Sequence, residues 1–235
     1  MKETFKLAEF EVEVSFKDIK NVHLSVKPPN GRVEMTAPIG TRPAAVRAYA
    51  ASKIGWIREK RARMAKQRRE TSRQYVSRES HMLWGRRYLL KVIERDERPQ
   101  VHMNHRQLML IVRPGSTRER RREIIEAWHR ELLHKEIPPL ISKWEKRLGV
   151  EVESYALQRM KTKWGSCNRK ARRIRINSEL IKKPKELLDY VVVHEMAHLI
   201  ASTHSEQFVE LLTSHYPSWR QARAELNALP LSAND

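Results

Sequence analysis

The chain has 235 residues and a mass of 27.8 kDa, which suits one large domain or two small ones. Hydrophobic residues make up 40% and charged residues 32%, a composition typical of a globular protein with a highly charged surface. The 47 Lys and Arg residues exceed the 28 Asp and Glu residues, which gives a net charge of +19. The single cysteine excludes an intrachain disulfide, and no apolar run is long enough for a signal peptide or a membrane span, so we expect a cytoplasmic protein with no membrane association.

The beginning of the chain is predicted to consist of short strands. Residues 9–17 alternate between apolar and polar side chains, which indicates a strand with one buried face. Two more strands are predicted over 22–26 and 32–36. The residues between them, Pro29-Asn30-Gly31, are typical of a hairpin turn because Asn and Gly tolerate positive φ.

A long basic helix is predicted from Pro43, with an arginine-rich end that reaches about Arg73. The segment Arg42–Arg78 contains 12 Lys and Arg and two acids, and Arg159–Arg175 contains eight and none. Such segments are usually solvated surface, but both are candidate contacts for nucleic acid or another polyanion. We expect no interleaved aromatic stacking platform in the first segment, which disfavours single-stranded nucleic acid there.

Strands predicted over 82–93 and 107–113 complete the N-terminal part. Pro114-Gly115 ends this block, so we place a boundary there. The predicted domains are 1–115, a strand-rich accessory or specificity region with the basic helix, and 116–235.

The second region is predicted to mix helices and strands, so the fold class is α+β. Ser116-x-x-Glu119 has the form of a capping box at the start of a helix, which Pro138-Pro139 would break or kink. Strands follow over 151–157 and 173–177. Three further helices are predicted over 184–201, 205–212 and 217–226.

One helical segment carries the strongest chemical signal, His194-Glu195-Met196-Ala197-His198, which is an H-E-x-x-H motif. The residues around it are apolar nearly all round, so the helix should be buried. Two imidazoles and a carboxylate are costly to bury unless a partner such as a divalent metal satisfies them. Positions i and i+4 share one face, so both rings can reach one ion, while Glu195 is offset toward a bound water.

A third ligand is expected at His204, six residues after His198. Thr203-x-x-Glu206 resembles a capping box, which would place His204 in the first turn of the next helix, close to the motif. The spacing equals that of metzincins, but Ala201 occupies their glycine position and no later methionine exists, which excludes that group. The competing third ligands are His215, Glu210 and Glu225.

The residues that carry a wider resemblance are Trp164-Gly165-Ser166-Cys167, Asn177-x-x-Leu180, Pro184, the stretch from Asp189 to His198, His204, Phe208, Pro217 and Trp219. With them the C-terminal part, most strongly about 149–226, resembles the YgjP-like metallopeptidase family, relatives of the SprT-type zinc proteases. The resemblance implies a zincin-like fold and a zinc metallopeptidase acting on protein or peptide substrates. It does not supply a particular substrate.

These inferences predict one Zn²⁺ held by His194, His198 and His204, with Glu195 as the general base that activates zinc-bound water for peptide hydrolysis. The basic residues flanking Trp164–Cys167 favour acidic substrates or recruitment by nucleic acid. The alternative function is a polyanion-binding protein with a structural or inactive metal site, or a nucleic-acid-recruited SprT-like protease.

Four residues are candidates for the substrate groove: Trp164, Gly165, Ser166 and Asn177. In this interpretation Gly165 lets a peptide backbone approach closely, Trp164 packs on it, and Ser166 hydrogen-bonds to it. The competing interpretation is a tight turn with a core tryptophan. Asn177, His215 and Tyr216 are candidate oxyanion donors, and Cys167 is expected to be a small buried residue.

Overall fold

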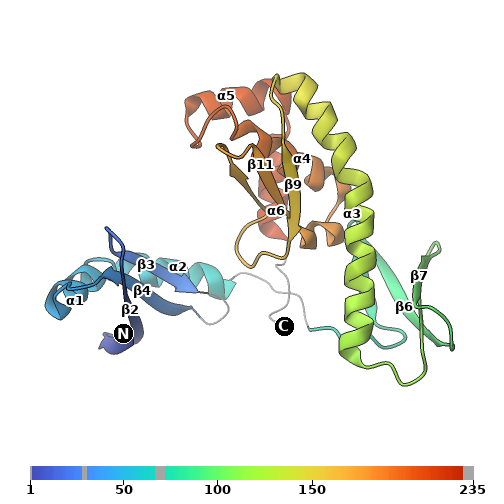
Figure 1. The fold of residues 1–235 in the computed structure, drawn as a ribbon, viewed down its shortest axis with the longest axis horizontal. Helices are drawn as coiled ribbons and strands as arrows, with labels where there is room; N and C mark the ends of the chain where they lie inside the picture. The colour runs from blue at the N-terminus through green and yellow to red at the C-terminus, as the bar shows by residue number, and fades with distance from the viewer. Residues whose placement is uncertain (1, 28–30, 67–71, 230–235) are drawn as a thin grey trace. The chain divides into compact units, whose positions relative to one another are not determined.

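The computed structural model describes residues 2–27, 31–66 and 72–229, and its helices and sheets give an α+β fold as predicted (Figure 1). The chain divides into two compact units, residues 1–70 and 71–232. Each unit has its own hydrophobic core, so each is described separately. Among the described residues, no helix combines the length and apolar character needed to cross a bilayer.

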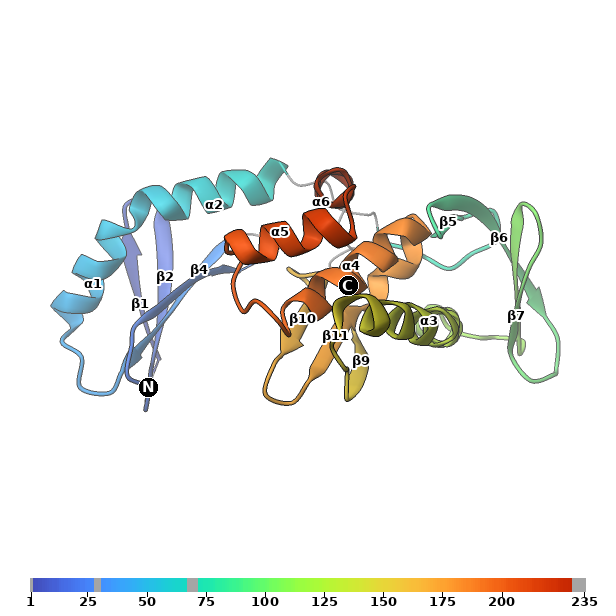
Figure 2. The ribbon, with the colours of Figure 1, turned by 90° about the horizontal axis from the view of Figure 1, so that it is seen from above.

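The first unit is a four-stranded sheet in the order β1-β2-β4-β3, covered by two helices. Its elements are β1 (Lys2–Leu7), β2 (Phe10–Lys17), β3 (His23–Lys27), β4 (Arg32–Pro38), α1 (Pro43–Ser52) and α2 (Ile54–Lys66). β2 pairs parallel with β4, and β3 pairs antiparallel with β4. The apolar positions of β2 pack with Val46, Ala50 and Ile57 of the helices, which therefore cover one face of the sheet (Figure 2).

The three strands expected in this unit are confirmed, whereas β1 had not been predicted. The long helix expected from Pro43 to about Arg73 is divided at Lys53 into α1 and α2. α2 is described as far as Lys66, residues 67–71 lie outside the described residues, and residues 72–76 are not helical. Of the expected turn Pro29-Asn30-Gly31 only Gly31 is described, with φ of 68°, the left-handed value that a glycine accepts readily.

The second unit joins two sheets and the remaining helices around one core. Its elements are β5 (Ser80–Leu83), β6 (Arg86–Glu94), β7 (Gln100–Met103), β8 (Gln107–Val112), α3 (Arg118–Leu148), β9 (Ser154–Gln158), β10 (Gly165–Asn168), β11 (Arg173–Asn177), the 3₁₀ helix η1 (Ser178–Lys182), α4 (Lys185–Ala197), α5 (Glu206–His215) and α6 (Trp219–Ala228). The strand orders are β5-β6-β8-β7 and β10-β11-β9.

The boundary of this unit differs from the expected division at 115/116. Leu90 and Leu110 of the β5–β8 sheet belong to the same core as Ile125 and Leu133 of α3. Burial of the apolar faces of these strands against α3 joins residues 71–115 to the C-terminal part, which a turn signal at Pro114-Gly115 does not reveal.

Three local expectations in this unit were wrong. The strand expected over 82–93 is divided by a turn in which Trp84 and Gly85 both have positive φ, 49° and 75°. The N-cap of α3 is Thr117, whose hydroxyl accepts from the Arg120 amide at 3.2 Å, and not Ser116. α3 also runs unbroken through Pro138-Pro139, which lie on its exposed side, where water can satisfy the carbonyls that lose a donor.

Candidate metal centre and its buried carboxylate

The H-E-x-x-H motif lies at the C-terminal end of α4, a helix whose side chains are buried on nearly every side. His194 and Glu195 are in its last turn, and His198 is the first residue after it, with φ of −67° and ψ of −14° that preserve the helical course. The two histidines therefore remain one turn apart on one face, as the spacing predicts.

Three imidazoles meet at this end of α4. One nitrogen from each of His194, His198 and His204 lies within 4.8 Å of the others, and among the described residues this is the one such group of possible metal ligands. The Nε2 atoms of His194 and His204 are 3.2 Å apart. Phe208 of α5 contacts all three rings, with centroid distances of 4.7 to 5.1 Å, so the imidazoles are packed against an aromatic wall.

The position of His204 relative to α5 differs from the expectation. α5 begins at Glu206 with Ser205 as its N-cap and without a side-chain capping bond, so His204 lies in the loop before the helix and not in its first turn. The capping box expected from Thr203 and Glu206 is therefore wrong. The other candidate third ligands, Glu210, His215 and Glu225, are not part of the cluster.

Two contacts orient the rings from outside the cluster. The Nδ1 of His198 lies 3.0 Å from the Ala201 carbonyl oxygen, so this nitrogen donates and Nε2 keeps its lone pair. The Nδ1 of His194 lies 3.4 Å from the hydroxyl of Tyr190, one turn earlier on α4. Neither partner was identified from the sequence, although Tyr190 stands at the i−4 position that could have suggested it.

The surroundings of His194 and His204 favour the neutral form of both rings. Burial lowers the pKa of His194 to about 3, with further lowering from His198, His204 and the charge of Arg223 on α6. Burial is also the main cause that lowers the pKa of His204. Neutral imidazoles offer lone pairs to a cation, which charged ones cannot do. Arg223, whose charge acts on this site, was not singled out from the sequence.

The carboxyl group of Glu195 is buried next to the histidines, with only 6% of the residue exposed. Burial raises its pKa to about 8, and the charge of Lys163 partly opposes this rise. Its position depends on Gly165, the first residue of β10. A Cβ at this glycine would lie 2.5 Å from Oε1 and 2.6 Å from Cγ of Glu195, so only a residue without a side chain fits there.

Residues Gly165–Cys167 of this segment thus belong to the strand β10 beside the carboxylate, not to a tight turn, and Trp164 precedes the strand. Because β10 pairs only with β11 in the order β10-β11-β9, its other edge is open within this sheet. The close approach that Gly165 permits is made by Glu195, whereas a peptide backbone had been expected there. Trp164 and Cys167 pack against the core, and burial raises the pKa of the Cys167 thiol to about 11.

Asn177 holds in place the loop that precedes Trp164. Its amide nitrogen donates to the carbonyls of Met160 at 2.8 Å and Lys163 at 2.7 Å, and its oxygen accepts from the amide of Glu179 at 3.1 Å. Both amide hydrogens are therefore used to hold the loop that leads to Trp164, which leaves none for a substrate. The Tyr216 hydroxyl likewise donates to the Glu186 carbonyl, at 3.4 Å.

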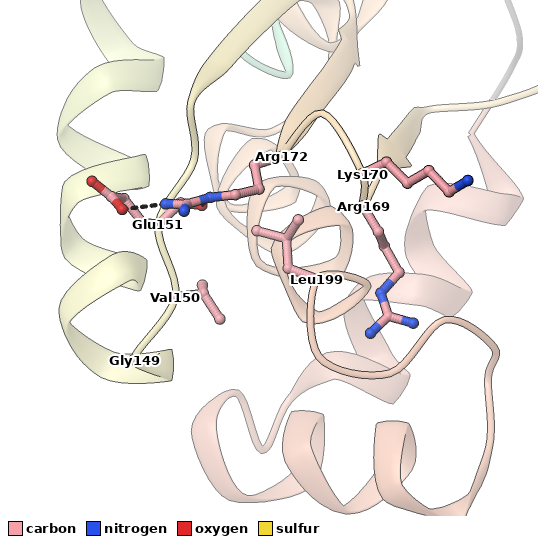
Figure 3. A pocket seen from close by; sticks show the side chains of 7 residues that line it. All are labelled: Gly149, Val150, Glu151, Arg169, Lys170, Arg172 and Leu199. Carbon is pink, nitrogen blue, oxygen red and sulfur yellow. Dashed lines mark hydrogen bonds and ion pairs between the residues drawn. The ribbon is translucent and has the colours of Figure 1, made fainter.

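Part of the second basic segment borders a pocket of about 880 Å³ near the turn that follows α4 (Figure 3). Its lining residues are Gly149, Val150, Glu151, Arg169, Lys170, Arg172 and Leu199. Arg172 is bonded to the carboxylate of Glu151, and Arg169 donates to the Ile200 carbonyl at 3.2 Å.

A model of the YgjP-like metallopeptidase domain matches residues 20–229 of the chain. The chain belongs to the YgjP-like metallopeptidase family. This confirms the predicted resemblance and extends it toward the N-terminus, across the boundary between the two compact units. Membership in a family of metallopeptidases implies a catalytic metal and peptide substrates.

Two solved structures have partial similarity to the chain. Both are metallopeptidase zymogens: abylysin of Pyrococcus abyssi, with a TM-score of 0.36, and jannalysin of Methanocaldococcus jannaschii, with 0.34. Each is 20% identical and covers 38% of this chain, and the matches cover 90% and 92% of the two proteins respectively. None of the curated proteins matches the chain.

Proposed function

We propose that the chain is a zinc-dependent peptidase in which His194, His198 and His204 hold one Zn²⁺ and Glu195 is the general base. The observation that carries the proposal is the separation of 3.2 Å between the Nε2 atoms of His194 and His204. Two nitrogens bound at about 2.0–2.1 Å to one tetrahedral ion lie about 3.3 Å apart, so this pair already has the spacing of shared ligands.

The donor set fits zinc by its chemistry as well as its spacing. Three neutral imidazoles are common ligands of catalytic zinc, and three protein ligands leave the fourth position for water or substrate. Bound there, zinc would act as a Lewis acid and make a coordinated water more acidic. The contacts of His194 with Tyr190 and of His198 with Ala201 would hold the ring orientations that such a site needs.

The chain's own residues supply the proton transfers. Glu195 would take a proton from the attacking water and pass it to the leaving amine. Its burial and the bare backbone of Gly165 hold the carboxyl group against the start of β10. The open edge of β10, which begins at Gly165, could pair with an extended peptide and present a carbonyl to this centre.

The course of β10 also suggests a substrate preference. The strand leads from Gly165 to the hairpin that carries Arg169 and Lys170, and both line the basic pocket of Figure 3. A peptide bound along β10 would meet these cations at one end. We therefore propose that acidic side chains near the cleaved bond are favoured.

The test compares the wild-type chain with Glu195→Gln, using elemental analysis and cleavage of a peptide library and a denatured protein. We expect one zinc per chain in both proteins and cleavage by the wild type alone, because the amide cannot accept the proton. Replacing each of the three histidines with alanine should reduce zinc content. If zinc-loaded wild type cleaves nothing with nucleic acid present or absent, the metal site is not a peptidase centre and the polyanion-binding alternative gains.

A further inference from the structure

The first unit carries a surface stripe in which aromatic and cationic side chains alternate along α1 and α2. Its members form two pairs with the same spacing of four residues: Tyr49 of α1 with Lys53 at the C-cap of that helix, and Trp56 with Lys60 on α2. Tyr49 and Trp56 are each 37% exposed. Among the described residues no other aromatic side chain is classed as exposed, so the two most accessible rings both lie in this stripe.

We expected no interleaved aromatic platform in the basic segment, yet Tyr49 on α1 and Trp56 on α2 are both exposed there. Each ring also has a lysine beside it. The ammonium of Lys53 lies 5.9 Å from the Tyr49 ring centroid, and that of Lys60 lies 5.8 Å from the Trp56 ring centroid.

The arginines of the same helices have a different role. Arg58 binds the carboxylate of Glu9 at 2.8 Å, and the guanidinium groups of Arg47 and Arg61 lie over the rings of Phe5 and Phe10 at 5.3 and 4.9 Å. These contacts attach the helices to β1, β2 and the turn between them. Arg47, Arg58 and Arg61 therefore hold the fold, whereas Lys53 and Lys60 each lie beside an exposed ring.

We propose that this stripe, Tyr49–Lys53–Trp56–Lys60, binds single-stranded nucleic acid. Unpaired bases would stack on the exposed faces of the indole and phenol rings, and the two ammonium groups beside the rings would contact the flanking phosphates. A base pair inside a duplex presents no free face to these rings, so single strands are favoured over duplex. An acidic protein would use the lysines but has no need of the two exposed rings. The proposal does not depend on the metal centre or on peptidase activity.

The test measures binding of the full chain to a fluorescein-labelled oligothymidylate by fluorescence anisotropy. Trp56→Ala and Tyr49→Ala should each weaken binding by about 5- to 150-fold, the range that corresponds to loss of one stacked base. Trp56→Phe keeps a ring and should recover most of the affinity. The matched control is Ile39→Ala, which removes a side chain 72% exposed in the same unit and should leave binding unchanged.

Two further arms separate stacking from charge alone. Lys53→Gln and Lys60→Gln should each reduce the slope of log affinity against log salt concentration by about 0.7. A duplex of matched length and a poly-glutamate peptide should both compete poorly with the labelled strand. The proposal is overturned if the chain fails to bind the oligonucleotide, if Trp56→Ala binds as well as wild type, if Ile39→Ala weakens binding equally, or if poly-glutamate competes as well as the unlabelled strand.

Discussion

Replacement of Gly165 with alanine should inactivate the enzyme while leaving its metal site intact. The added Cβ would lie 2.5 Å from Oε1, 2.6 Å from Cγ and 2.7 Å from Cδ of Glu195. An ordinary contact begins at 3.4 Å, so the carboxyl group must retreat by roughly 0.9 Å if the strand stays in place. Because the Glu195 side chain is buried, it has no free space into which it can move without displacing core atoms.

A displacement of about 1 Å in a catalytic group can cost a factor of about 100 in rate, so kcat/KM of Gly165→Ala should fall by about two orders of magnitude. Overpacking should also lower the free energy of unfolding by about 1–3 kcal/mol. Zinc content should stay at the wild-type level, because the histidine ligands approach from α4 and the loop before α5 and not from β10.

The assay measures kcat/KM on a peptide that the wild type cleaves, zinc content by elemental analysis, and unfolding by circular dichroism. Gly55→Ala is the matched control: a Cβ at Gly55 meets nothing within 4 Å, and the residue lies in helix α2 of the other unit. If Gly165→Ala cleaves at the wild-type rate with full zinc content, the carboxyl group of Glu195 is not held where the reaction needs it, and the reasoning fails.

Three other predictions follow from the same structure. Tyr190→Phe removes the hydroxyl that lies 3.4 Å from His194 Nδ1, so zinc affinity should fall by about tenfold in a competition assay with a chelator. An unchanged affinity would exclude the idea that Tyr190 orients the His194 ring. Burial lowers the pKa of His129 from 6.5 to about 3, so the unfolded state binds the extra proton first as pH falls. The free energy of unfolding should therefore decline below pH 6.5, by about 2 kcal/mol at pH 5. Urea titrations should show a flatter pH dependence for His129→Gln than for the wild type. Lys170→Glu should lower kcat/KM for peptides with acidic side chains by about fivefold at low salt, and it should hardly change kcat/KM for neutral peptides. An equal loss for both kinds of peptide would show that the basic pocket does not select substrates.

The sequence was most informative where one element alone decides the outcome. The alternation in residues 9–17 and the helical spacing of Val46, Ala50, Ile54 and Ile57 indicated the face that packs on the core, because the period of a strand or helix fixes which residues share a face. Of these apolar positions, Phe16 and Ile54 are only partly buried. The strands predicted over 107–113 and 173–177 also formed close to their expected bounds, as β8 and β11.

It was least informative where a local signal competed with distant packing. A turn at Trp84-Gly85 was missed because its amides donate to the Ile181 and Lys182 carbonyls of η1, which lie almost a hundred residues later in the chain. Pro114-Gly115 is a true turn, yet the β5–β8 sheet before it shares a core with α3. A boundary between units depends on which apolar faces bury one another, and the turn residues do not specify that.

For the site, the sequence by itself determined the chemical groups: two imidazoles one turn apart, a carboxylate between them, and an apolar helix that carries all three. Their spacing along a single helix is enough for this, because 3.6 residues per turn fixes their relative directions. Only the tertiary structure decided that Gly165 makes room for Glu195, that Phe208 packs on the three rings, and which two aromatic side chains remain exposed. Those contacts join segments far apart in the chain, and the packing of the whole core, which no local pattern encodes, sets the distances between them.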